Sequence, residues 1–68
     1  MSELIFLVEE DPEGGYTARG IGQSIFTEAD TLEVLRGKIR EAVQVHFDID
    51  TTPKVVRLHI VREEILAA

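Results

Sequence analysis

Four carboxylates fall within five positions near the start of the chain, at Glu9, Glu10, Asp11 and Glu13. Carboxylates this close together can hold a divalent cation or attract a basic partner. A cation site needs oxygen ligands that converge, whereas Asp11, Pro12 and Glu13 have the composition of a solvated turn. We therefore interpret the four residues as a partner-binding surface. An acidic surface that simply keeps a small protein in solution is an equal alternative.

Few other side chains have the chemistry for catalysis. The chain has no cysteine, and its two histidines are His46 and His59. His46 lies on the apolar side of an expected helix, which is typical of a packed imidazole or of one that caps the helix end. His59 shares a strand face with Arg57, where a surface or interface position is expected. We predict no catalytic residue, no metal site and no cofactor.

The net charge of −6 is unevenly distributed. Residues 1–30 hold seven acids and one base, whereas residues 31–68 hold six of each. Such a field repels a phosphate backbone, so direct binding of nucleic acid is disfavoured, and it attracts a basic protein. No apolar run reaches the roughly 20 residues of a membrane span, and Met1-Ser2-Glu3 lacks the basic start of a signal peptide. A soluble cytoplasmic protein is expected.

The remaining pattern predicts one α+β domain over residues 1–68. Leu4 to Val8 is a continuous apolar run of strand length, and the proline and glycines that follow favour a tight hairpin. Apolar residues at spacings of three and four then indicate a helix. We predict strands over residues 4–8, 16–21, 24–28 and 54–62, and a helix over residues 31–46.

The lengths of the connections predict the topology. The first three strands are joined by segments too short for crossovers, so they form an antiparallel meander. After the helix, the fourth strand returns parallel to the first by a right-handed crossover. The expected order is βββαβ, with the first strand between the second and the fourth.

The helix is expected to begin at Asp30 as its N-cap, with Glu33 three residues on in a capping-box arrangement. Gly37 costs about 1 kcal/mol relative to alanine within a helix, which hints at close packing there. The stripe that faces the core is predicted to consist of Leu32, Leu35, Ile39, Ala42, Val43 and His46.

Self-association is expected for two reasons. A domain of this size is marginally stable, and without disulfides the common remedy is an oligomer. The strand from Leu4 to Val8 is apolar on both faces, so one face needs the helix and the other a second subunit. Val34 and Val45 lie nearly opposite the core stripe of the helix. We therefore predict oligomer contacts at Ile5, Leu7, Val34 and Val45.

Three short motifs carry a resemblance to a known family. Residues 8–18, VEEDPEGGYTA, are followed by TEADTLE at residues 27–33 and REAV at residues 40–43. Their order and spacing resemble the hairpin, the helix entry and the helix of HicB-like antitoxins, over about residues 4–47. The resemblance implies a truncated RNase H-like fold of βββαβ order. It also implies an antitoxin that covers HicA, a small basic mRNA-cleaving toxin.

The chain departs from that family in three places. The loop at residues 20–23 is shortened, and Ala29 replaces the usual glycine before Asp30. Nothing after Ile60 is long enough for the DNA-binding module that many such antitoxins carry, so operator binding is not expected. A solitary oligomeric protein without a toxin is the alternative reading.

A metal-dependent nuclease is a third hypothesis, because enzymes with an RNase H-like fold cleave nucleic acid. They need several converging carboxylates, normally with one in the middle of the first strand. The run from Leu4 to Val8 has no acid, and Glu33 is better explained as a cap partner. We therefore expect no nuclease activity.

Overall fold

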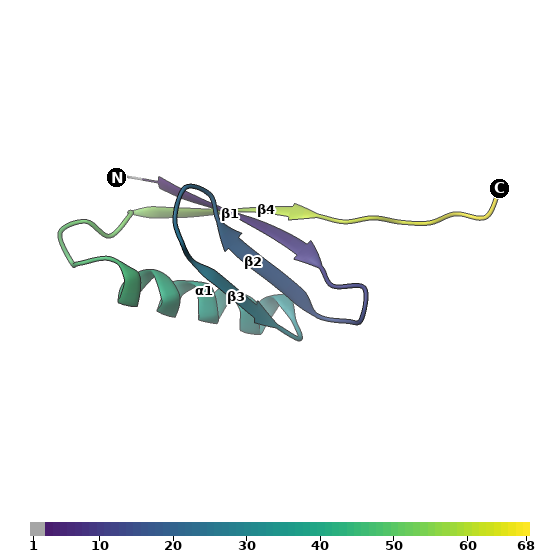
Figure 1. The fold of residues 1–68 in the computed structure, drawn as a ribbon, viewed down its shortest axis with the longest axis horizontal. Helices are drawn as coiled ribbons and strands as arrows, with labels where there is room; N and C mark the ends of the chain where they lie inside the picture. Colours follow the sequence, from purple (N-terminus) through teal and green to yellow (C-terminus); the bar gives the residue numbers. More distant parts are fainter. Residues whose placement is uncertain (1–2) are drawn as a thin grey trace.

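The fold is an α+β arrangement of one sheet and one helix, and it follows the βββαβ order (Figure 1). A computed structural model describes residues 3–68, so Met1 and Ser2 and the expectation about a leader there lie outside the described residues. The predicted order and fold class are confirmed. The elements are β1 Glu3–Glu10, β2 Tyr16–Gly20, β3 Phe26–Ala29, α1 Leu32–His46 and β4 Val55–Val61.

The sheet has the strand order β3-β2-β1-β4. The pairs β1–β2 and β2–β3 are antiparallel, and β4 runs parallel to β1 after the crossover through α1. The predicted meander and the central position of the first strand are confirmed. Residues 6–9 of β1 pair with both neighbouring strands, and the side chains of β1 alternate between the two faces of the sheet.

The β1–β2 turn is built by Asp11 and two glycines. The Oδ1 atom of Asp11 accepts a hydrogen bond from the Glu13 N–H at 2.9 Å, and the Asp11 carbonyl accepts one from the Gly14 N–H at 2.9 Å. Gly14 and Gly15 have φ values of 107° and 84°. A Cβ atom on Gly15 would lie 2.9 Å from the carbonyl oxygen of Ala29, so this position needs glycine for its conformation and for space.

The helix begins one residue later than expected, and Asp30 is not its N-cap. Thr31 holds that position, with Oγ1 accepting a hydrogen bond from the Val34 N–H at 3.2 Å. The capping box is therefore also wrong, because Glu33 lies two residues after the cap and not three. Glu33 still occupies the first turn, where its charge is favourable to the helix dipole.

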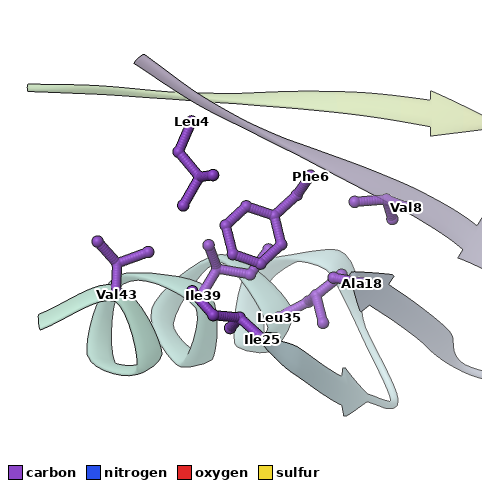
Figure 2. Close-up of a cluster of buried hydrophobic side chains, with 8 residues drawn as sticks. All are labelled: Leu4, Phe6, Val8, Ala18, Ile25, Leu35, Ile39 and Val43. Carbon is purple, nitrogen blue, oxygen red and sulfur yellow. The ribbon is translucent and has the colours of Figure 1, made fainter. Parts of the chain in front are cut away.

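The core lies between the helix and one face of the sheet (Figure 2). The ring of Phe6 reaches from β1 toward α1 and is completely buried. Alternate residues of β1 and residues of α1 at spacings of four supply most of the other members, as the sequence periodicity predicts. The buried residues are Leu4, Phe6, Val8, Ala18, Ile25, Leu35, Ile39 and Val43.

His46 is exposed, so the prediction that it belongs to the buried stripe is wrong. It is the last residue of α1, and its Nε2 atom lies 3.3 Å from Oε1 of Gln23 in the β2–β3 loop. Its ring meets the ring of Phe47 edge-on, with centroids 4.9 Å apart. The imidazole therefore contacts the β2–β3 loop and the neighbouring ring of Phe47, and it is not buried in the core.

The helix covers one face of the sheet, and it covers that face unevenly. It lies nearest to β3 and β2, which leaves Val56 and Leu58 of β4 half-buried. On the opposite face, Ile5 and Leu7 of β1 are half-buried, and no helix or strand of residues 3–68 lies over them. We refer to this second surface as the open face.

Gly37 and Gly15 give opposite predictions for substitution by alanine. Nothing lies within 4 Å of a Cβ atom built on Gly37, so the hint of close packing there is wrong. Gly37→Ala should raise the free energy of unfolding by about 0.5–1 kcal/mol through helix propensity. Gly15→Ala should lower it, because the new methyl group meets the Ala29 carbonyl. Urea denaturation measures both, and a destabilised Gly37→Ala protein would contradict the open surroundings of that residue.

The position of the N-cap is also testable. Thr31→Ala removes the acceptor for the Val34 N–H and should cost about 1 kcal/mol of stability. Asp30→Ala should change stability by less than about half of that, as expected for an exposed residue outside the helix. The two variants are compared by thermal or urea denaturation. A larger loss for Asp30→Ala would restore Asp30 as the cap.

Candidate functional site

Six carboxylates gather at the end of the sheet where β1 turns into β2 and where β3 leads into α1. Glu10 pairs with Tyr16, and Tyr16 pairs with Ala29, so the register brings these two connections side by side. Residues distant in sequence therefore share one surface, which we call the acidic end. Its members are Glu9, Glu10, Asp11, Glu13, Glu28 and Asp30.

The cations near the acidic end compensate its charge only partly. The Nζ atom of Lys38 donates to the carbonyl oxygen of Glu28 at 3.0 Å, and Nε of Arg62 lies 3.2 Å from Oε1 of Glu10. Both contacts are exposed, so water and salt screen them strongly. Glu3, the seventh acid of the first half, lies at the other end of β1 and binds Arg57 at 2.6 Å. The excess negative charge of residues 1–30 is thus concentrated at one end of the sheet.

Two shallow hollows flank the acidic end. One has a volume of about 380 Å³, and its lining includes Asp11, Asp30, Val34 and Lys38. The other, of about 490 Å³, lies on the far side of the turn, and its lining includes Glu9, Glu10, Val61 and Ile65. Each hollow combines carboxylates with an apolar side chain. Such a mixed, open surface suits a protein partner better than an enclosed small molecule.

The four carboxylates predicted from the sequence as a partner surface do not have the same role. Asp11 is half-buried and its Oδ1 atom closes the turn, whereas Glu9, Glu10 and Glu13 are exposed. Glu28 was missed, because it lies within β3 and only the sheet register, which pairs it with Thr17, places it beside the turn. The exposed members are the ones that a partner can reach directly.

The four residues predicted as oligomer contacts fall on two separate surfaces. Ile5 and Leu7 lie on the open face. Val34 and Val45 lie on the flank of α1 beside β3, where each lines a hollow. The structure therefore brings them together in pairs and not as one patch.

Several exposed apolar residues were missed as candidate contacts. Phe26 lies on β3, Val55 and Val61 lie on the open face of β4, and Ile65 and Leu66 follow that strand. A sequence signal existed for β4, because Val55–Val61 has apolar residues at both alternating sets of positions.

The histidines do not join a cluster that could hold a metal. Across residues 3–68, no group of three or more His, Cys, Asp or Glu side chains has suitable geometry. His59 is exposed on the open face, opposite Leu7 in the register. This agrees with the surface position expected from the sequence. In the same part of the chain, no helix is long and apolar enough to cross a membrane.

The fold and its surfaces thus define a small α+β protein with one helix on a four-stranded mixed sheet. The chain belongs to the UPF0150 family. It is 50% identical over 52 residues to a UPF0150 protein of Archaeoglobus fulgidus, covering 76% of this chain and 77% of that protein. It is 38% identical over 65 residues to a UPF0150 protein of Thermotoga maritima, covering 96% and 91%. No family model matches the chain, and no solved structure matches it.

The role of Asp11 in the turn can be separated from its charge. Asp11→Ala should lower the free energy of unfolding by roughly 0.5–1.5 kcal/mol, the usual net value of a hydrogen bond. Asp11→Asn keeps a side-chain oxygen that can accept from the Glu13 N–H, so it should lose less. Glu13→Ala is the control and should stay within about 0.5 kcal/mol of the unaltered protein. Equal losses in all three, measured by urea denaturation, would contradict the turn-building role.

Proposed function

We propose that the protein is a HicB-like antitoxin that binds and neutralises a small basic mRNA-cleaving toxin through protein–protein contacts. The observation that carries this proposal is the acidic end, where the fold collects six carboxylates from the ends of β1 and β3 and from the connections that follow these strands. Two motifs that resemble HicB-like antitoxins build this end, because residues 8–18 form the hairpin and residues 27–33 connect β3 to α1. The βββαβ order also agrees with the fold that the resemblance implies.

The mechanism follows from charge. A toxin that cleaves mRNA must present basic groups to the phosphate backbone. The acidic end offers those groups carboxylates in place of phosphates, so bound antitoxin and RNA compete for the same surface. Exposed charges of opposite sign also accelerate the encounter of the two proteins, by an amount that falls with ionic strength.

Affinity requires more than exposed charge. Surface ion pairs contribute about 0–1 kcal/mol each, so desolvated apolar contacts must supply much of the binding energy. Val34 is half-exposed and lies in the same hollow as Asp11 and Asp30. Tyr16 lines that hollow as well. The carboxylates thus surround apolar side chains that a partner can cover.

Charge reversal at the acidic end tests the proposal. Glu10→Lys combined with Glu13→Lys should slow association with the basic toxin that the proposal requires by at least about tenfold at low salt. Stopped-flow fluorescence or surface plasmon resonance measures the association rate at two or more salt concentrations.

A matched control separates local charge from total charge. Glu41→Lys combined with Asp50→Lys changes the net charge equally, at exposed positions outside the acidic end. The control should slow association much less. Equal slowing by both variants would remove the acidic end from the interface, and no salt-sensitive complex at all would refute the antitoxin function.

A solitary oligomer without a toxin is the second candidate, and the open face favours it. Ile5 and Leu7 lie at the centre of a sheet surface over which residues 3–68 place no helix or strand. The exposed Val55 and Val61 lie on the same face of β4, and the exposed Phe26 lies on the same face of β3. A sheet face that combines several exposed apolar side chains with arginines is typical of contacts between proteins. A gene neighbourhood without a short basic reading frame would favour this candidate over the antitoxin.

A further inference from the structure

Strand β4 is incompletely covered at its outer edge and on both of its faces. Its pairing with β1 uses one edge, and no strand of residues 3–68 pairs with the other. Val55 on the open face is 50% exposed, and Ile60 on the helix-covered face is 48% exposed. Because α1 lies toward β3, a hollow of about 200 Å³ opens between the helix and β4, lined by Arg36, Ile39, Arg40, Val56 and Leu58.

The segment after β4 continues in the direction of the strand and extends past the sheet (Figure 1). Residues 62–68 are all exposed, and they account for much of the 52 Å long axis of the molecule. Ile65 is 94% exposed, and Leu66 beside it is 79% exposed. An extended segment with apolar side chains in water is suited to adding a strand to an unpaired edge.

We propose that β4 and residues 62–65 pair antiparallel with the same strand of a second copy of this chain, with Ile60 on the two-fold axis. The inference rests on the proposed self-association and specifies its interface. A two-fold contact of this kind ends at a dimer, because each β4 edge donates and accepts the same set of hydrogen bonds. Two four-stranded sheets would become one continuous sheet.

Cross-strand pairing on the open face supports this register. With Ile60 opposite its own copy, Val55 faces Ile65 of the second copy and Arg57 faces its Glu63. Apolar pairs and pairs of opposite charge are the stabilising combinations across neighbouring strands. The Nε–H group of Arg57 donates a hydrogen bond to Oε1 of Glu3, and the other N–H groups of the guanidinium can donate to a second carboxylate.

On the other face, the same register covers Ile60 and brings Glu64 near two arginines. Glu64 of the second copy falls opposite Val56, which lines the hollow with Arg36 and Arg40. Ile60 meets the Ile60 of the second copy, so an exposed isoleucine becomes covered on the axis. Each of these contacts occurs twice in the dimer, except the one on the axis.

Neighbouring registers combine less favourable side chains. An axis at His59 sets Glu63 against Val55 and Val61 against Arg57. An axis at Val61 sets Ile65 against Arg57. An axis at Arg62 sets two arginines against each other. The Ile60 axis has mismatches as well, because Arg62 falls opposite Leu58, His59 opposite Val61 and Glu64 opposite Val56. Its Val55–Ile65 apolar pair and its Arg57–Glu63 ion pair favour Ile60 as the centre.

The second edge of the sheet is a weaker template. Strand β3 has four residues, Phe26–Ala29, whereas β4 has seven and contains no proline. Short edge strands are a common means of avoiding association, and a long apolar edge promotes it. The β4 edge is therefore the one that fits a second copy.

Cysteine pairs test the interface directly, because the chain has no cysteine of its own. A Val55→Cys protein mixed with an Ile65→Cys protein should give a disulfide-linked heterodimer on mild oxidation, more readily than either variant alone. Arg57→Cys mixed with Ile65→Cys should give much less. The reverse preference would move the axis to Val61 and overturn the register.

A matched pair of isoleucines tests the contribution of the segment. Ile65→Lys should weaken self-association by about tenfold or more in sedimentation or light-scattering measurements, because the lost contact occurs twice. Ile49→Lys, at a residue 93% exposed in the α1–β4 connection, should leave self-association unchanged. A dimer that resists Ile65→Lys and gives no disulfide would overturn the β4 interface but leave self-association standing. A monomer at micromolar concentration would overturn both.

Discussion

The structure depends on the central position of β1, which pairs with β2 on one side and β4 on the other. Side chains of a strand alternate between the two faces of the sheet. The neighbours in sequence of each core residue therefore lie on the opposite face. Phe6 is completely buried against α1, and Ile5 and Leu7 are therefore directed away from the helix. One helix cannot cover both faces. The open face is thus a direct consequence of how this chain makes its core.

Much of the fold could be predicted because its signals are local and repeated. The apolar run of β1, the turn chemistry of Asp11 and the glycines, and the periodicity of α1 each point to one structure. The predictions that failed depend on a shift of the helix start by one residue, or on which part of the fold a side chain meets. Thr31 and Asp30 are both good caps by type, and the observed helix start selects Thr31. The surroundings of His46 depend on the β2–β3 loop, which brings Gln23 to the last turn of the helix.

The candidate surfaces divide in the same way. Glu9 to Glu13 are contiguous in sequence, so a cluster of charge there was predictable, whereas Glu28 and Asp30 join it only through the sheet register. The uncovered β4 was not predictable, because the helix could have been centred over the whole sheet. The displacement of the helix toward β3 is a result of packing, and it leaves Val56 and Leu58 only half-buried. The alternating pattern of β4 in the sequence gives no sign of this.

The acidic end and the β4 edge have compatible positions. The hollow lined by Val34 and Lys38 lies beside β3, at the edge of the sheet opposite β4. A second copy added along β4 would therefore leave that hollow accessible and would present two acidic ends in one assembly. Two linked sites raise the effective concentration of each contact when a partner can engage both. On these two proposals, the dimer contact takes up the hollow at Val61 and Ile65, and the hollow at Val34 and Lys38 stays free for a partner.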